Sequence, residues 1–337
     1  MPRKTQNKPQ RAGFTAFWLR RSFLACLLWP VSLIFSALAQ IRRVLITPQR
    51  LPVPVVVVGG ITVGGAGKTP VTLWLVEALR AQGFVPAIIS RGYGGAVSGV
   101  LAVSPDSDAE LVGDEPVLLR QRAQCPVFVG RDRVAAGRVL LSAHPEVNLI
   151  LCDDGLQHYR LARDFEIVVL DRRGLGNGWQ LPAGPLREAA CRLRQIDALV
   201  LNEARAPDVV APATFAMQLQ GSSFYRLAQP AQTTTAEALR GQALHAVAGI
   251  GEPQRFFDHL SALGLSFEAH PFPDHHAYSA DELAFDGGVV LTTEKDAVKL
   301  RATLPPDAPV WVLPVTAQIT GGLDQLIVEK LNGRAPA

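Results

Sequence analysis

A short apolar strand, a glycine-rich loop and a helix follow one another near residue 60, and this order constrains the fold more than any other feature of the chain. Residues 55–58 are four consecutive valines, typical of a buried parallel strand, and the pattern over 71–81 predicts a helix. The loop between them ends in Gly67-Lys68-Thr69. Glycines here let backbone N–H groups turn onto phosphate oxygens at the positive end of the helix. The sequence therefore predicts a P-loop within an α/β fold.

The predicted P-loop departs from the strict pattern GxxxxGK[ST] at one position, because Thr62 stands where the first glycine is expected. A glycine-rich turn that binds nothing is the alternative, but Gly-Lys-Thr at the start of a helix favours a phosphate site. We expect Lys68 to reach the β- and γ-phosphates of a nucleoside triphosphate and Thr69 to hold Mg²⁺. The predicted nucleotide-binding residues are Thr62, Val63, Gly64, Gly65, Ala66, Gly67, Lys68 and Thr69.

A second apolar strand, predicted over 148–152, ends in the two carboxylates of Asp153 and Asp154. This is the form of a Walker B strand, whose acidic end fixes the metal ion of a P-loop enzyme. An Asp-Gly turn is the alternative, since Gly155 follows. With a P-loop upstream, metal binding is favoured for at least one of the pair, and Asp153 is the first candidate. A nucleoside triphosphate and Mg²⁺ are thus expected at this site.

Charge is distributed unevenly along the chain. Residues 1–50 hold nine basic side chains and no acidic one, whereas 51–337 hold 24 basic and 30 acidic side chains. An acidic main part argues against a nucleic-acid partner, which needs a basic face, while a basic apolar N-terminal segment suits anionic lipid. The four cysteines form no CxxC pair, which predicts reduced thiols and no zinc site. No obligate protein partner is indicated.

The uncharged run over 22–41 has the length of a membrane helix. Two features favour export instead: residues 20–24 resemble a twin-arginine signal, and 37–39 resemble a signal-peptidase site. A simple span conflicts with the positive-inside rule, because six basic residues precede the run and three follow it, and Pro30 weakens a straight helix. We expect an anchor that enters or lies in the cytoplasmic leaflet, with a single span as the second choice.

Apolar strands alternate with helical stretches after the P-loop, which predicts a parallel sheet with helices on both faces. Helices are expected over 110–121 and 131–143. The further strands are expected over 85–89, 127–129, 148–152, 166–170 and 198–201.

A smaller α/β domain is expected to follow, with strands near 244–248, 288–292 and 310–315, and the active site is expected between the two domains. Turn residues at 221–223, between apolar stretches, predict a hairpin in the connecting segment. The expected division is an N-terminal segment with the anchor, a P-loop core, a linker with the hairpin and the smaller domain, over residues 1–50, 51–205, 206–240 and 241–337.

Seven short strings occur in an order that resembles one known family. They are TVGGAGKTP from Thr62, SRGYG from Ser90, GDEP from Gly113, DDGLQH from Asp153, LPAGPLRE from Leu181, DHH from Asp274 and TEKD from Thr293. Together with the apolar N-terminal segment they resemble tetraacyldisaccharide 4′-kinase, the lipid A 4′-kinase of Gram-negative bacteria. The resemblance runs from the anchor to about residue 300. It implies ATP-dependent phosphorylation of the 4′-hydroxyl of a tetraacylated glucosamine disaccharide 1-phosphate at the cytoplasmic face of the inner membrane.

The resemblance also implies roles for individual residues. Asp114 would act as the base, with His275 or His276 as its partner. The metal ligands would be Asp153 and Asp154, with Glu115 as a further candidate and Thr69 from the P-loop. Arg187 is a candidate clamp for phosphate, since guanidinium offers a planar fork of donors. Substrate contacts are expected from Arg91, Tyr93, Gln157 and His158.

Alternatives remain open from the residues alone. Asp114 follows a glycine and precedes a helical pattern, so the residues alone favour a helix cap, and the DHH string is typical of a solvated loop. A P-loop GTPase or ATPase switch protein at the membrane would share the two phosphate and metal motifs. Thr293-Glu294-Lys295-Asp296 is only a loose echo of the guanine-reading string Asn-Lys-x-Asp. An exported, membrane-anchored binding protein would share the N-terminal segment.

Overall fold

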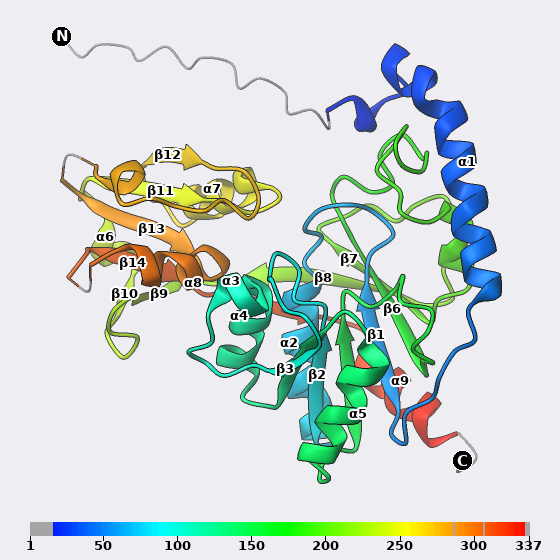
Figure 1. The fold of residues 1–337 in the computed structure, drawn as a ribbon. Coiled ribbons are helices and arrows are strands. Elements are labelled where there is room, and N and C mark those ends of the chain that lie inside the picture. Colours follow the sequence, from blue (N-terminus) through cyan, green and yellow to red (C-terminus); the bar gives the residue numbers. More distant parts are fainter. Residues whose placement is uncertain (1–15, 286, 306, 334–337) are drawn as a thin grey trace.

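The computed structural model describes residues 16–285, 287–305 and 307–333, and it contains two β-sheets. The basic side chains among residues 1–15, and the last four residues of the expected smaller domain, lie outside this described part. Figure 1 shows two lobes side by side, one around each sheet, with the long helix α1 along the outer edge of the larger lobe. We call them the nine-stranded lobe and the six-stranded lobe.

The nine-stranded sheet confirms the predicted P-loop architecture. Seven of its strands run parallel, and the edge strands β3 and β15 run antiparallel to their neighbours. Every strand predicted in the core is present, with ends that differ by one or two residues. In spatial order the strands are β15 (Thr316–Ile319), β8 (Thr214–Gln220), β7 (Ala198–Asn202), β6 (Phe165–Asp171), β1 (Val55–Gly59), β5 (Leu149–Asp153), β2 (Pro86–Ser90), β4 (Val127–Gly130) and β3 (Val100–Ala102).

Helices cover both faces of this sheet, as expected for strands that are buried throughout. On one face, apolar side chains of α2 (Lys68–Ala81), α4 (Asp114–Ala123) and α9 (Leu323–Asn332) share one core cluster with the strands. On the other face, α5 (Arg133–Ala143) packs with the segment that contains Leu186 and Leu193. The shorter helices are η1 (Ala16–Leu19), α3 (Ala109–Val112) and η2 (Ala190–Arg194).

Two predicted helices begin or break at other residues. The helix after the P-loop starts at Lys68 rather than Val71, because Pro70 is tolerated in a first turn, where no intrahelical N–H bond is needed. The single helix expected over 110–121 is two helices, α3 and α4. They are divided at Gly113, whose φ of 93° lies in a region that favours glycine. This break makes Asp114 the first residue of a new helix.

The six-stranded lobe also has a mixed sheet, with strands β11 to β14 parallel and β9 and β10 antiparallel. In spatial order its strands are β10 (Thr233–Thr235), β9 (Ser223–Arg226), β14 (Val310–Leu313), β13 (Val289–Thr293), β11 (Leu244–Ala248) and β12 (Glu268–Pro271). Its helices are α6 (Ala236–Leu239), α7 (Pro253–Ala262), η3 (Asp281–Leu283) and α8 (Glu294–Thr303).

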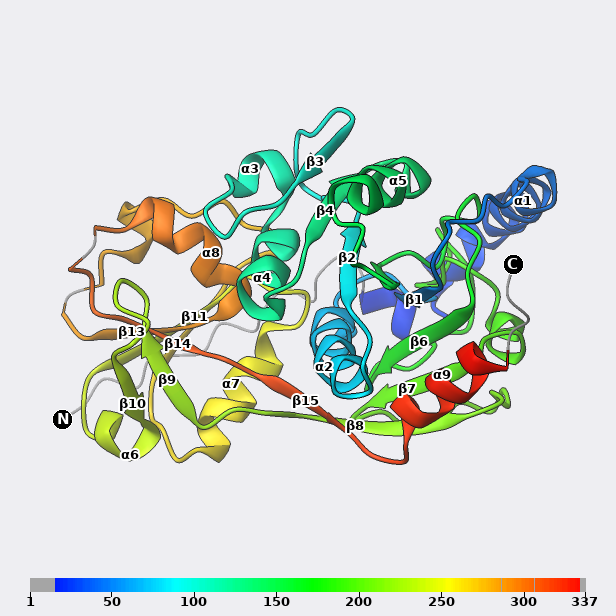
Figure 2. The same ribbon diagram turned by 90° about the horizontal axis from the view of Figure 1, so that it is seen from below.

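The hairpin predicted around 221–223 is wrong. Strand β8 pairs with β7 and β15 in the larger sheet, whereas β9 pairs with β10 and β14 in the smaller one. The chain therefore crosses from one lobe to the other at this turn, and it crosses back between β14 and β15 (Figure 2). The six-stranded lobe thus begins before residue 241, and β15 and α9 belong to the nine-stranded lobe. The two crossings touch, because a side-chain carbon on Gly221 would collide with the carbonyl oxygen of Pro314.

Helix α1 (Phe23–Leu45) lies on the surface with most of its apolar side chains exposed. Its polar stripe faces the protein: the Ser32 hydroxyl donates to the Gln180 carbonyl oxygen at 2.7 Å, and Ser36 donates to the Gln180 side chain at 2.5 Å. Among the described residues, α1 is the one helix with the length and apolar composition needed to cross a membrane. Pro30 lies inside the helix without ending it.

Candidate active site

The P-loop joins β1 to α2 and is shaped by its glycines. Gly67, the N-cap of α2, has φ of 97°, and a side-chain carbon there would lie 2.6 Å from the Asn202 amide nitrogen. Thr62 needs no such freedom, because it forms an extended bridge with Leu186. This local pairing explains why the loop works without the first glycine of the strict pattern. The first amide groups of α2 therefore point into the loop, as an anion site requires.

Lys68 reaches back over the loop. Its Nζ atom lies 3.5 Å from the Gly64 carbonyl oxygen and 3.7 Å from Asp154 Oδ1. Arg187 approaches the same carboxylate, with its two terminal nitrogens 3.1 and 3.3 Å from the Asp154 oxygens, and its Nε donates to the Thr62 carbonyl oxygen. Burial would raise the pKa of Asp154, but Lys68 and Arg187 hold it below its usual range. Two cations thus converge at the P-loop, as phosphate binding requires.

The carboxylates of Asp153 and Asp154 stand where β5 ends, and the charge of a third carboxylate, Glu115, acts on Asp153. Asp153 is buried, and its Oδ1 accepts a hydrogen bond from the Thr72 hydroxyl at 2.9 Å. Its Oδ2 is buried without a hydrogen-bond partner. Burial and the negative charges of Glu115 and Asp154 raise the pKa of Asp153 to about 7. An unpartnered buried carboxylate oxygen beside two further carboxylates fits a hard divalent cation such as Mg²⁺.

Asp114 is 3% exposed and is held by groups of the six-stranded lobe. His275 Nδ1 lies 3.1 Å from Asp114 Oδ2, and Lys299 Nζ lies 3.2 Å from the same oxygen. Burial would raise the pKa of Asp114, but the hydrogen bond from His275 and the charges of Lys295, His275 and Lys299 hold it well below its usual range. The same hydrogen bond raises the pKa of His275. The cap interpretation of Asp114 is wrong, because Gly113 is the N-cap of α4.

Lys295 is a site residue that the sequence did not identify. Its Nζ lies 3.1 Å from Glu115 Oε1, 3.1 Å from Asp274 Oδ1 and 3.4 Å from His275 Nε2. These carboxylates keep the pKa of Lys295 above its usual range in spite of burial. Lys295 belongs to the string TEKD, which carried the resemblance but suggested no role. It joins Glu115 of the nine-stranded lobe to the loop that holds His275.

Helices α4 and α8 face each other across the lobes and carry these contacts in sequence (Figure 2). Besides the pairs of Lys295 and Lys299, Arg122 Nη1 lies 2.6 and 2.5 Å from the two carboxylate oxygens of Glu294. Glu294 also accepts from the backbone N–H of Val315 at 3.2 Å. These ion pairs hold the two lobes closed around the site.

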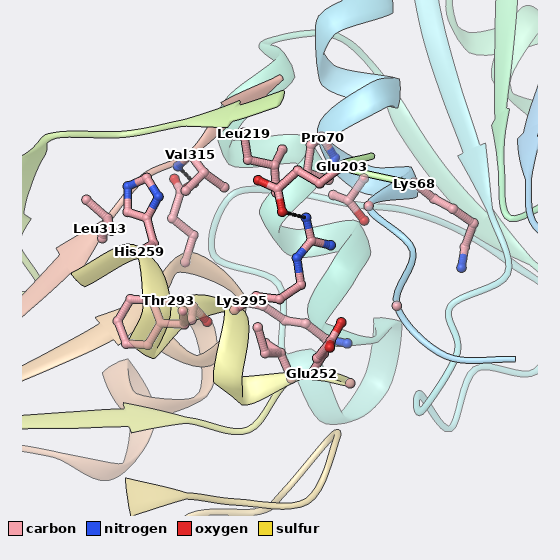
Figure 3. A pocket seen from close by; sticks show the side chains of 18 of the residues that line it. Lys68, Pro70, Glu203, Leu219, Glu252, His259, Thr293, Lys295, Leu313 and Val315 are labelled. Carbon is pink, nitrogen blue, oxygen red and sulfur yellow. Dashed lines mark hydrogen bonds and ion pairs between the residues drawn. The ribbon is translucent and has the colours of Figure 1, made fainter. Parts of the chain in front are cut away.

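A cavity of about 450 Å³ lies between the lobes, next to the P-loop. Figure 3 shows Lys68 and Pro70 at one end, and His259 and Leu313 at the other. The walls are mostly apolar, which suits a flat ring system more than a charged group. Ile250, Phe256, Arg255 and Glu203 also line the cavity.

The loop Gly249-Ile250-Gly251 meets the P-loop directly. A side-chain carbon on Gly251 would lie 2.9 Å from the backbone nitrogen of Gly65. The Gly249 N–H donates to the Asp296 carboxylate at 3.1 Å. The loop is a strand-to-helix turn between β11 and α7, and its glycines let the two lobes approach closely.

The other predicted site residues lie in different surroundings. Tyr93 is exposed and its ring centre is 5.2 Å from that of His275. Arg91 is exposed at the end of β2. His276 points away from Asp114, since its Nε2 lies 3.2 Å from the Glu282 carboxylate oxygens and its ring contacts Phe272.

Gln157 and His158 make contacts within the protein. The Gln157 amide donates to the Gly60 carbonyl oxygen at 3.0 Å and to Glu188 at 2.7 Å, so it supports the P-loop from below. His158 Nε2 lies 3.3 Å from the backbone nitrogen of Arg133, at the start of α5. Burial and the Arg133 charge lower the pKa of His158 to about 4, so this histidine is neutral. Their expected contacts with substrate stay predictions.

Comparisons with known proteins cover nearly the whole chain. The family model described as Tetraacyldisaccharide-1-P 4′-kinase matches residues 24–332. The chain is 52% identical to the tetraacyldisaccharide 4′-kinase of Dechloromonas aromatica (strain RCB), covering 94% of this chain and 96% of that protein. It is 51% identical to the protein of the same name from Azoarcus sp. (strain BH72), covering 96% of each.

A solved structure agrees with these matches. LpxK from Aquifex aeolicus, crystallised in complex with ATP, has a TM-score of 0.78 to this structure at 30% sequence identity, and the match covers 91% of this chain and 99% of that one. The resemblance of the seven strings is therefore confirmed over the full fold. The chain belongs to the tetraacyldisaccharide-1-P 4′-kinase family.

Proposed function

We propose that this chain transfers the γ-phosphate of ATP to the 4′-hydroxyl of a tetraacylated glucosamine disaccharide 1-phosphate, with Asp114 as the base. Family membership supports the kinase activity, and the cluster of cations and carboxylates around the P-loop supports its chemistry. The alternative of a switch protein at the membrane is set aside, because the matched family is a kinase family.

ATP would lie across both parts of the cleft. The phosphates would lie on the P-loop, where Lys68 and Arg187 supply positive charge for the transferred group. The adenine would enter the cavity between the lobes, against Ile250 and Phe256. Arg255, which donates to Asn202 at 2.7 Å, and Glu203, which pairs with Arg255, offer polar groups near its mouth.

Asp114 suits a base that takes a proton late in the transfer. The bond from the 4′-oxygen to the γ-phosphorus forms while the bond to the leaving ADP oxygen breaks, and the hydroxyl proton moves to the Asp114 carboxylate. The depressed pKa keeps this carboxylate ionised, so it accepts a hydrogen bond from the sugar hydroxyl and orients it. His275 holds the second carboxylate oxygen and fixes its direction.

Asp153, Asp154, Glu115 and Thr69 would hold Mg²⁺. When bound, this ion would neutralise charge on the phosphates and orient them for in-line transfer. The residues themselves prepare the place: Asp153 points an unpartnered oxygen into it, and Lys295 fixes Glu115 from the other lobe.

We infer that α1 holds the enzyme at the cytoplasmic side of the inner membrane. Its exposed apolar side chains, among them Phe23 at 86% and Val44 at 83%, would be stabilised by acyl chains. Basic residues flank the apolar run at both ends, which suits anionic headgroups on one side of the bilayer. The acylated substrate lies in the same lipid phase, and ATP is available on the cytoplasmic side.

The single observation that carries the proposal is the chain of contacts that joins Asp114, through His275 and Lys295, to Glu115 at the cavity beside the P-loop. The test is incubation of the full chain, in detergent, with γ-labelled ATP and tetraacyldisaccharide 1-phosphate, followed by product analysis. Transfer of label to the 4′-position supports the proposal. Label released only as inorganic phosphate, or none transferred, contradicts it.

A further inference from the structure

Three metal-ligand side chains meet in the six-stranded lobe, away from the P-loop. They are those of His245, Glu268 and His270, and one ligand atom of each lies within 4.8 Å of the others. His245 stands on β11 and pairs in register with Glu268 on the neighbouring strand β12. Because side chains alternate along a strand, Glu268 and His270 point to the same face of the sheet, which is also the face of His245, the register partner of Glu268. The strand pairing itself thus builds the group.

The distances suit one small ion. His245 Nδ1 lies 3.1 Å from His270 Nε2 and 3.7 Å from Glu268 Oε2. Two ligands that bind a tetrahedral zinc ion at its usual bond lengths lie ~3.3 Å apart. The two separations from His245 bracket this value, and the third pair, Glu268 and His270, lies within 4.8 Å.

The second nitrogen of His245 fixes which tautomer is present. Its Nε2 lies 3.1 Å from the carbonyl oxygen of Gly287, which can only accept, so Nε2 carries the proton. Nδ1 is then a lone pair that faces His270. Histidines that bind metals commonly donate their other ring N–H to a backbone carbonyl in this way, which orients the ring and raises its basicity. In the metal-free state, His270 fills the position by donating to Nδ1.

Phe285 shields the two rings on one side. Its ring centre lies 4.4 Å from that of His245 and 4.2 Å from that of His270, and both pairs are stacked. Glu268 is 70% exposed in its side chain and leaves a path for an ion from solvent. The group is therefore rigid on one side and open on the other.

We propose that His245, Glu268 and His270 form a site for a divalent transition-metal ion, with zinc as the ion of choice. Two imidazoles and one carboxylate favour zinc over magnesium, which prefers oxygen ligands only, and a water completes the fourth position. The site is distinct from the carboxylate cluster at the P-loop, with which it shares no residue. Binding would clamp the edge strand β12 to β11 and stabilise the six-stranded lobe.

The experiment is a titration of the full chain, in detergent and without nucleotide, with Zn²⁺ in competition with a chromophoric chelator. We expect one zinc ion per chain. His245→Gln and His270→Gln should each weaken its binding by more than about 100-fold, beyond the 10- to 100-fold typical of losing an outer hydrogen-bond partner. Glu268→Gln, at an exposed position, tests the site without disturbing the packed rings and should also weaken binding.

Two controls separate this site from other donors. His144→Gln removes a histidine outside the group, whose Nδ1 lies 3.2 Å from Glu146 Oε1, and should leave zinc binding unchanged. Asp153→Asn removes the likeliest competing site, the carboxylate cluster at the P-loop, and should do the same. Cobalt in place of zinc should give the visible absorption of a four-coordinate site in the wild type and in both controls, but not in the two histidine variants. Absence of zinc binding, or its loss in Asp153→Asn while both histidine variants retain it, would overturn the proposal.

Discussion

His275 and Asp114 belong to different lobes, yet a ring nitrogen of one lies 3.1 Å from a carboxylate oxygen of the other. Asp114 opens helix α4 of the nine-stranded lobe, and His275 lies in the loop after β12 of the six-stranded lobe. The orientation of the proposed base is therefore set only when the lobes are closed. Substrate entry and catalysis then need different arrangements of the same two residues.

Asp114→Asn should reduce turnover by at least about 100-fold and change the KM for ATP little, because the base acts on the sugar hydroxyl. The amide keeps the shape of the side chain but accepts no proton. The measurement is steady-state kinetics with both substrates, with circular dichroism to verify folding. A variant that keeps its turnover would remove Asp114 from the base role.

The stability contributed by the His275–Asp114 pair should depend on pH in a defined window. The pKa of Asp114 is depressed, so its contribution is present above the usual aspartate range and is lost as pH falls. The pKa of His275 is raised, so its contribution is complete below about 6.5 and is lost as pH rises through the folded value. The difference in Tm between wild type and His275→Gln should thus be largest near pH 5 to 6 and smaller at pH 9. An equal difference at all pH values would show that the pair is uncharged.

Lys68→Ala should reduce phosphoryl transfer by about 100- to 1,000-fold, because a preorganised cation at the transferred phosphate is lost. The matched control is Lys330→Ala, which removes a half-exposed lysine whose ion pair with Asp197 lies outside the site. The control should keep full activity. Equal activity of a folded Lys68 variant would contradict the P-loop assignment.

Binding of Mg²⁺ should weaken as pH falls below about 7, because Asp153, with its pKa raised to about 7, then takes a proton in place of the ion. Asp153→Asn should raise the Mg²⁺ concentration needed for half-maximal activity and remove this pH dependence. Magnesium titrations of wild type and variant at pH 6, 7 and 8 test both statements. Identical curves for the two proteins would leave Asp153 with a purely structural role.

Removal of the N-terminal segment up to Arg50 should lower turnover of substrate in vesicles more than turnover in detergent, because α1 brings the enzyme to the lipid. A periplasm-dependent reporter fused to Ala337 should be inactive, and the mature chain should keep its N-terminal segment. An active reporter, or cleavage after Ala39, would instead identify an export signal.

Local patterns predicted the parts of the site that stand at the ends of predicted strands. Asp153 is the last residue of β5, and Lys68 begins the helix after β1. Strands β1 and β5 are neighbours in the sheet, so their ends meet. Lys295 and Lys299 were not predicted to bind there. Their partners Glu115 and Asp114 lie about 180 residues earlier, and only the closure of the lobes brings them together.

Turn signals were less informative about strand partners. Gly221-Ser222-Ser223 marks a turn correctly, but the turn does not determine whether the strands on either side pair with each other. Here β8 pairs within the nine-stranded sheet and β9 within the six-stranded sheet. Their pairings with β15 and β14 join residues that are too far apart in the chain for a short sequence window to contain them. The helix break at Gly113 could not be predicted from the apolar pattern either, because it depends on the backbone conformation of that glycine.

The chain crosses between the lobes at Gly221 and again at Pro314, and the two crossings are in contact. Together they have the geometry of a two-stranded hinge. A single strand between two bodies lets them swing, slide and twist, whereas two strands in contact bend easily about one axis and resist shear. Such a hinge would let the lobes rotate apart about one axis and close again along the same path. It would return Asp114 and Glu115 to the same partners, His275 and Lys295, each time the lobes close. Leu313 and Val315, on either side of Pro314, also line the cavity proposed for adenine, so the joint lies next to the substrate that it helps to position.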